Sequence, residues 1–237
     1  MLDNRVEPPA APRTRRIVET LELDIVMMRL HPRERLVEGA LAERFQVSRA
    51  TVRTALAELE RRALIVRVPN VGATVVDLQP DQVRALYEAR EVVETAVVGM
   101  IRLPLPRPAI GRLIAAQREH DAAVAARDLR RVFETNIRFH AEMNALCGNP
   151  HLIEMLELLA ARSHVVRSYS HSDPVVLEAA ARNHWDMIEA IEQEDRDRLV
   201  ELRRAHLQPS KNAYIRAYRQ RFPEEAARSD PATAHEA

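Results

Sequence analysis

Residues 35–76 read RLVEGALAERFQVSRATVRTALAELERRALIVRVPNVGATVV, and their pattern changes from helical to extended near residue 64. Val52, Ala55, Leu56 and Leu59 form the apolar stripe of a helix, and Ser48 is a typical helix N-cap. Two β-rich runs, 64–68 and 73–78, flank a turn-forming segment at 69–72. Working outward, we expect two earlier helices over about 14–30 and 36–45, so three helices precede a hairpin.

This order is that of a winged helix-turn-helix, whose third helix enters the DNA major groove. The first turn of that helix carries Arg49 and Arg53 on its polar side, and arginine binds guanine edges or phosphates. Seven arginines and four glutamates lie between residues 35 and 67, within a chain of zero net charge. The pattern alone leaves two interpretations open, a DNA-binding domain and a helical core that merely exposes arginines.

The composition places limits on the class of protein. The chain has 237 residues, 46% hydrophobic and 30% charged, which is typical of a globular protein with room for two domains. Cys147 is the single cysteine, so no disulfide forms within the chain. No apolar run reaches the roughly 20 residues of a membrane span, and the N-terminus lacks the apolar segment of a signal peptide. We therefore expect a cytoplasmic location.

After Pro80 the β pattern ends, and the expected fold is mainly α, a winged helix-turn-helix followed by an all-α bundle. The expected domains are a flexible arm over 1–13, the DNA-binding domain over 14–78, the helical domain over 80–220 and a polar tail over 221–237. Proline-, glycine- and acid-containing breaks divide the helical domain into six expected helices, at about 81–102, 106–126, 128–147, 150–171, 174–193 and 195–220.

Three histidines of the helical domain lie in the middle of apolar stripes. They are His140, His184 and His206, and Asn136 lies one helical turn before the first. A single histidine on such a stripe is usually a hydrogen-bonded core residue, but imidazoles that meet in a bundle can bind a transition metal. The spacing does not show that the stripes converge, so both interpretations stay open. The other histidines are expected at the surface: His31, His120, His151, His164 and His171.

The N-terminal stretch closely resembles the DNA-binding domain of the GntR family. The matching pattern is LA-x-R-x-x-V-S-R-x-x-V-R-x-A-L-x-x-L over 41–59, followed by the wing P-N-x-G-A-x-V over 69–75. Thr54 and Ala63 stand where the family usually has glutamate and glycine. The resemblance implies DNA contacts from Arg49 and Arg53 with help from neighbours. The full predicted set is Arg35, Ser48, Arg49, Thr51, Arg53, Asn70 and Gly72.

Residues 80–220 resemble the FCD ligand-binding domain of the FadR subfamily, and their six expected helices resemble its VanR-like branch. The matching pieces include 86–90 with Glu94, Phe139-His140, 148–150 and 205–207. The resemblance implies that Asn136, His140, His184 and His206 hold a divalent transition metal, zinc or nickel. It also implies a small carboxylate effector with Arg90, and more weakly Arg167, as counter-charge. A salt bridge from Arg90 to Glu94 is the alternative use of that arginine.

These patterns predict a homodimeric transcription regulator, a repressor, that binds operator DNA and responds to a small organic acid. We expect no catalytic residues and therefore no enzyme activity. Two alternatives remain, a metal-dependent hydrolase domain fused to a DNA-binding unit, and a regulator that senses the metal itself. The hydrolase lacks an obvious general base beside the ligands, because Glu142 lies on a different face of the helix from His140.

Overall fold

A computed structural model describes residues 12–68, 72–167, 169 and 174–223. The chain divides into two compact units, Met1–Asp77 and Leu78–Ala237. Most of the expected arm and most of the expected tail lie outside the described residues, and the last two residues of the arm, Pro12 and Arg13, belong to the first helix. Within the described part of the chain, no helix is long and apolar enough to span a membrane.

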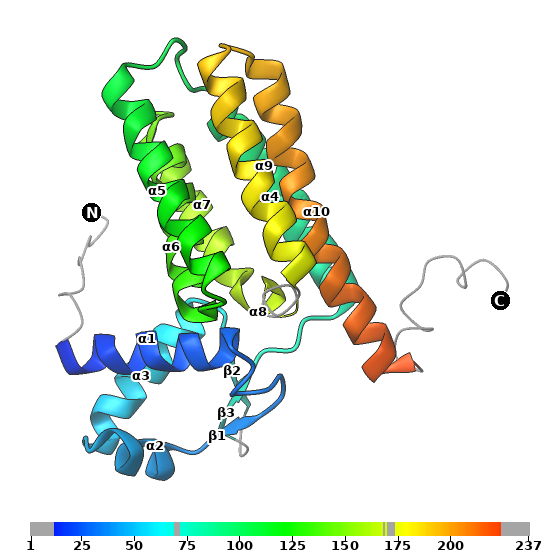
Figure 1. The fold of residues 1–237 in the computed structure, drawn as a ribbon. Helices are drawn as coiled ribbons and strands as arrows, with labels where there is room; N and C mark the ends of the chain where they lie inside the picture. The colour runs from blue at the N-terminus through cyan, green and yellow to red at the C-terminus, as the bar shows by residue number, and fades with distance from the viewer. Residues whose placement is uncertain (1–11, 69–71, 168, 170–173, 224–237) are drawn as a thin grey trace, which may run out of the picture. The chain divides into compact units, whose positions relative to one another are not determined.

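The N-terminal unit contains three helices and a small sheet (Figure 1). The helices are α1 (Pro12–Val26), α2 (Glu38–Phe45) and α3 (Arg49–Arg61). Strands β2 (Ile65–Val68) and β3 (Gly72–Val75) form the predicted antiparallel hairpin. A third strand, β1 (Arg35–Leu36), pairs with β3, so the strand order is β1-β3-β2. The sequence did not predict β1, because two residues are too few to show the alternation of a strand.

The core of this unit follows the predicted stripe of α3. All four residues of that stripe are buried, and α3 packs on α1, whose inward residues repeat at helical spacing. The side chains that form this core include Ile17, Leu21, Ile25, Val52, Ala55, Leu56 and Leu59. The winged helix-turn-helix predicted from residues 14–78 is therefore the observed fold of the unit.

Helix α3 ends in a Schellman motif that has no glycine. The N–H of Ala63 bonds to the carbonyl of Glu60 at 2.8 Å, and that of Leu64 to Leu59 at 3.0 Å. Ala63 has a φ of 55°, in the left-handed region, where a Cβ costs about 1–2 kcal/mol. The helix thus closes with an alanine in the conformation that glycine adopts more easily.

The C-terminal unit is all-helical. Its helices are α4 (Pro80–Gly99), α5 (Arg107–Ala125), α6 (Leu129–Ala145), α7 (Pro150–Arg162), α8 (His164–Arg167), α9 (Pro174–Glu192) and α10 (Arg196–Arg221). The prediction of one helix over 150–171 is wrong, because the helix breaks at Ser163. This buried serine turns its hydroxyl back to the carbonyl of Ala160 at 2.7 Å, which gives the backbone a local alternative to a continuing helix.

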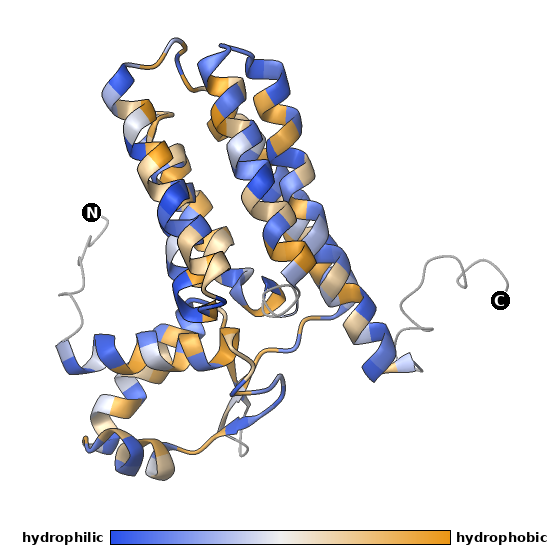
Figure 2. Ribbon diagram, in the orientation of Figure 1, coloured by the Kyte–Doolittle hydropathy of each residue, from blue (hydrophilic) through white to orange (hydrophobic). Residues whose placement is uncertain are grey.

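Helix α10 packs on α4 and α9, α5 packs on α6 and α9, and α7 packs on α4. Apolar faces turn toward one another inside the unit, and polar faces turn outward (Figure 2). The apolar cluster includes Val98, Leu113, Phe139, Met143, Met187, Ile188 and Leu199. Buried polar and charged side chains also occupy the interior, and they form the candidate site: Arg90, Glu94, Gln117, His120, Thr135, His140, His184 and Arg203.

Candidate functional site

The first turn of α3 is held by its own hydroxyl groups. The Oγ atom of Ser48 accepts a hydrogen bond from the N–H of Thr51 at 3.2 Å and lies 3.0 Å from the Thr51 hydroxyl. Arg49 and Arg53 are exposed on this turn, and the Nε atom of Arg53 donates to Glu38 at 2.9 Å. Ser48 and Thr51 therefore fix the start of the helix, and the two arginines extend from it.

Arg35 lies beside the hairpin, although it precedes the hairpin by two helices in the sequence. A Cβ atom added to Gly72 would lie 3.8 Å from the Nε atom of Arg35. Gly72 itself has a φ of 101°, which a residue with a Cβ rarely adopts. Asn70, the other predicted wing residue, lies outside the described residues.

In the C-terminal unit, three of the four predicted metal ligands come together. His140 of α6 and His206 of α10 approach with their Nε2 atoms 3.1 Å apart. The Nε2 atom of His184, from α9, lies 3.4 Å from that of His206. His140 and His184 are buried and His206 is half-buried, and one ligand atom from each lies within 4.8 Å of the others. Three imidazoles from three helices thus converge on one point.

Two of these rings are oriented by amide side chains. The Nδ1 atom of His184 lies 2.8 Å from Oε1 of Gln117, whose Nε2 atom donates to Asp121 and to the carbonyl of Ala181. These two acceptors fix the Gln117 amide, so its oxygen faces the ring and Nδ1 carries the proton. The Nδ1 atom of His206 similarly faces Oδ1 of Asn183 at 2.8 Å. Both rings therefore turn the lone pair of Nε2 toward the centre, as metal-binding histidines do.

His140 has a different outer partner. The Nη1 atom of Arg203 donates to its Nδ1 atom, so the ring proton lies on Nε2 and faces His206. His140 can coordinate a metal through Nε2 only in its other tautomer, with the proton moved to Nδ1 and the Arg203 hydrogen bond given up. The donor set fits a divalent transition metal at two rings as they stand, and at the third after this change.

The electrostatic setting keeps the cluster neutral. Burial lowers the pKa of His140 well below its usual range, and the positive charge of Arg203 adds to this effect. Burial is also the main cause that lowers the pKa of His184 well below its usual range, and the neighbouring His206 is the next cause. Burial and Arg203 together lower the pKa of His206 to about 3. Neutral imidazoles are the form that binds a metal.

A buried charge cluster adjoins the histidines. Arg90 donates from Nε to Oε1 of Glu94 at 2.8 Å, and the Nε atom of Arg203 lies 2.7 Å from Oε2 of the same carboxylate. Burial alone would raise the pKa of Glu94, but Arg203 and Arg90 lower it to about 2. The salt bridge considered for Arg90 is therefore present. Its Nη1 atom is nevertheless buried, without a hydrogen-bond partner among the described residues.

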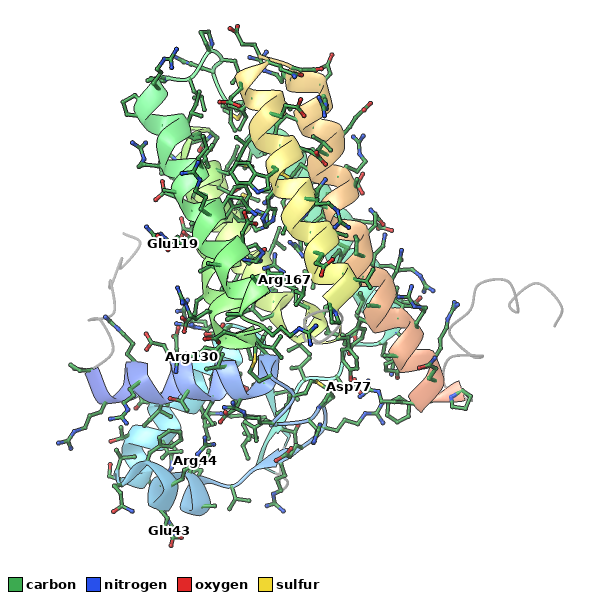
Figure 3. The ribbon with its side chains drawn as sticks, viewed as in Figure 1. Glu43, Arg44, Asp77, Glu119, Arg130 and Arg167 are labelled. Atoms are coloured by element: carbon green, nitrogen blue, oxygen red, sulfur yellow. The ribbon has the colours of Figure 1, made fainter. Side chains whose placement is uncertain are left out.

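A cavity of about 190 Å³ connects the predicted effector residues with part of the metal set. Its lining includes Arg90, Arg167, Asn136 and His206. Figure 3 shows Arg167 inside the helical unit, whereas Glu119 and Arg130 extend outward from α5 and α6. Burial lowers the pKa of Arg167 to about 10, with Arg90 as the next cause. Asn136 is half-buried and borders the cavity beside His206.

The expectation of a surface position is wrong for two histidines. His120 is buried, with Nδ1 3.0 Å from the hydroxyl of Thr135 and its ring 5.3 Å from that of His184. His164 is buried against Phe133, with ring centroids 5.0 Å apart. His120 follows Leu113 and Ala116 at helical spacing, a signal that its face turns inward. His31 and His151 are exposed, and His171 lies outside the described residues.

The sequence did not predict roles for three further residues of the site, Gln117, Asn183 and Arg203. A signal existed for Arg203, which lies four residues after Leu199 and four before Leu207 on the buried face of α10. Gln117 likewise follows Leu113 by four residues on α5. Spacing places such residues inside the bundle, but it does not identify their partners on other helices.

Two family models match the chain, one in each unit. Residues 13–75 match the model of the gntR family of bacterial regulatory proteins, and residues 85–209 match the FCD domain. The chain belongs to the GntR family of transcriptional regulators. Members of this family bind DNA, and FCD domains bind small-molecule effectors, so the two units are a DNA-binding unit and an effector-binding unit.

Relatives cover most of the chain. The HTH-type transcriptional repressor RspR of Escherichia coli (strain K12) is 28% identical over 202 residues, 84% of this chain and 88% of the relative. Among solved structures, E. coli McbR/YncC has a TM-score of 0.75 at 20% identity, covering 88% of this chain and 99% of that one. A putative GntR regulator from Rhodococcus sp. RHA1 has a TM-score of 0.74 at 22% identity, covering 88% of this chain and all of the other. At these identities the two structures support the fold alone.

Proposed function

We propose that this regulator is a homodimeric repressor whose operator binding changes when a small carboxylate binds beside a metal ion in the helical unit. The observation that carries the proposal is the convergence of three Nε2 atoms next to a cavity lined by Arg90 and Arg167. In this account neither the metal nor the acid undergoes chemistry, and binding alone is the signal.

At the DNA end, α3 would enter the major groove with Arg49 and Arg53 at base edges or phosphates. Arg35 and Gly72 would approach the backbone or the minor groove at the hairpin. Ser48 and Thr51 would support these contacts by fixing the first turn of α3. Operators with two half-sites call for a two-fold protein, which is the reason for proposing a dimer. The name of RspR, a repressor, favours repression over activation.

In the helical unit, His140, His184, His206 and Asn136 would hold the metal, zinc or nickel. Gln117 and Asn183 would keep two of the rings in the coordinating orientation. Bound there, the ion supplies a cationic centre that an oxygen anion can coordinate. Arg90 and Arg167 would provide the second charge for the acid within the 190 Å³ cavity. Asn136 is neutral, so the protein itself would supply no negative ligand, which favours an anion from solution.

A path from this site toward the DNA-binding unit runs along two helices. Helix α4 carries Arg90 and begins at Pro80, three residues after the boundary at Asp77. Helix α10 carries His206, and its Tyr214 hydroxyl donates to the carbonyl of Leu78 at 3.0 Å. Two of the helices that line the cavity, α4 and α10, therefore reach the start of the unit. An acid that prefers one arrangement of α4 and α10 would shift the linked DNA-binding unit, provided its affinity differs between the two states.

The test starts from the full-length protein freed of metal. Its affinity for operator DNA, selected from a random-sequence pool, is measured alone, with zinc, and with zinc plus lactate, malate or citrate. The proposal expects one zinc per chain and a change in DNA affinity only when an acid is added. A change with zinc alone would instead identify a metal sensor. If no acid alters DNA binding although zinc is bound, the proposed effector response is wrong.

A further inference from the structure

A second and larger cavity lies between α6 and α7. Its volume is about 400 Å³, within the range of about 300–1,000 Å³ that ligand pockets usually have. Helix α6 lines it at four-residue intervals, and α7 faces this wall with more aliphatic side chains. The aliphatic lining is Ile137, Ala141, Ala145, Ile153, Leu156, Ala160 and Ala161. Four of these side chains are alanine methyl groups, too short to fill the space between the helices.

The cavity has an exposed apolar end and a buried charged end. Ala141 and Ala145 are exposed, whereas Arg90, Glu94 and Arg203 are at most 2% exposed. Two guanidinium groups share one carboxylate at the buried end, which leaves one positive charge. The Nη1 atom of Arg90, a residue that lines this cavity and also the smaller one, is buried without a hydrogen-bond partner among the described residues. A buried donor in this state is stabilised by any ligand that brings an acceptor.

The remaining polar groups of the lining do not change its net charge. Arg167 and Glu157 carry opposite charges, Asn144 is uncharged, and the two histidines of the lining, His140 and His164, add no formal charge at pH 7. The lining as a whole therefore carries a single positive charge. One carboxylate balances it, whereas a second would lie against the alanine and isoleucine side chains, where a charge is costly.

We propose that this cavity binds a monocarboxylic acid with an apolar body. The carboxylate accepts hydrogen bonds from Nη1 of Arg90 and from Arg203, and the hydrocarbon lies between α6 and α7. This proposal rests on the effector role proposed above and names a second ligand class for the same unit, in a different cavity. The small acid at the histidines needs the metal; the apolar acid needs only residues of the chain.

The test compares straight-chain acids on the full-length protein by calorimetry, with and without zinc, because Arg203 also contacts His140. The acids are butanoate, hexanoate and octanoate. Each buried methylene contributes about 0.8 kcal/mol, so affinity should rise about fourfold per CH₂. Octanol and octanedioate serve as matched probes, because octanol lacks the carboxylate and octanedioate carries a second one at the other end of the chain. Both should bind at least tenfold more weakly than octanoate.

Variants separate the two ends of the cavity. Ala145→Leu and Ala160→Leu fill the apolar end and should remove the gain in affinity with chain length. Ala122→Leu, on the exposed side of α5, is the control and should leave it unchanged. Arg203→Gln should weaken octanoate binding at least tenfold. If Arg203→Gln fails to fold, the two leucine variants and the comparison of octanol with octanoate still test the proposal.

Two results would overturn the inference. One is an affinity that does not depend on chain length, and the other is unchanged octanoate binding in both leucine variants. If lactate, malate or citrate still alters DNA binding in that case, the proposed function stands without this second site. If octanoate binds as expected but no small acid alters DNA binding, the small-acid proposal fails and this inference remains.

Discussion

Replacing Gln117 by leucine should weaken metal binding without removing a ligand. Gln117 is fully buried, and its Oε1 atom holds the Nδ1–H of His184 at 2.8 Å. Leucine has a similar volume but cannot accept this hydrogen bond. No water can replace it readily, because the His184 side chain is also fully buried. The ring would then lose the contact that directs its Nε2 lone pair toward His140 and His206.

The expected magnitude follows from the lost contact. Loss of the outer partner of a metal-binding histidine usually lowers metal affinity about 10–100-fold, or roughly 1.4–2.8 kcal/mol. In the metal-free protein, the buried N–H of His184 would have no acceptor, which costs about 1–3 kcal/mol of unfolding free energy. Both effects should therefore appear in one variant, in separate measurements.

The assay is competition for zinc against a chelator of known affinity, together with urea unfolding of the metal-free protein. Gln193→Leu is the matched control, because Gln193 is exposed just after α9 and its side chain is hydrogen-bonded to Glu189 and Arg198 rather than to a histidine. It should change neither quantity by more than a few tenths of a kcal/mol. Zinc affinity within twofold of the parent protein in Gln117→Leu would refute the role assigned to His184 and its partner.

Three further predictions concern other parts of the chain. Arg49→Ala or Arg53→Ala should weaken operator binding by about 1–3 kcal/mol in an anisotropy titration. Arg61→Ala, at the far end of α3, is the control and should not weaken it. Equal operator affinities in all three variants would contradict the proposal that Arg49 and Arg53 contact DNA. Ala63→Gly should raise the unfolding free energy by up to about 1 kcal/mol, because glycine has no Cβ and adopts the left-handed φ of 55° without strain. A lower stability of this variant in urea unfolding would contradict the prediction. The metal-free protein should lose stability as pH falls below 6.5, the usual histidine pKa, because burial lowers the folded-state pKa of His206 to about 3 while the unfolded chain takes up a proton more readily. That residue alone accounts for about 1.4 kcal/mol per pH unit within this window, and unfolding curves between pH 7.5 and 5 with no such slope would contradict its neutral burial.

Much of the architecture could be predicted from local pattern. The stripe of α3 and its Ser48 cap are encoded within a dozen neighbouring residues, so no tertiary information was needed to locate them. The apolar stripes of α6 and α9 likewise placed His140 and His184 inside the bundle. The strand β1 escaped prediction because its two residues are held by pairing with β3, a contact distant in sequence.

The site was harder to predict than the fold, because its geometry depends on contacts between helices. Spacing along α10 could place Arg203 on the buried face, but its contacts with Glu94 and His140 join three helices. The partnership of Gln117 with His184 joins α5 to α9 in the same way. The break at Ser163 depends on one hydroxyl that competes with the helix, a choice that composition does not reveal.

An anisotropy titration of operator DNA with the zinc-loaded protein, with and without lactate, malate or citrate, shows whether an acid controls DNA binding. We expect at least one acid to change DNA affinity by about 5–150-fold, the usual size of such a coupling. Arg90→Ala should remove this response while it binds DNA normally without the acid, and Arg130→Ala, an exposed control on α6, should keep the response. Unchanged DNA affinity with an acid that calorimetry shows to be bound, or a full response in Arg90→Ala, would contradict the account.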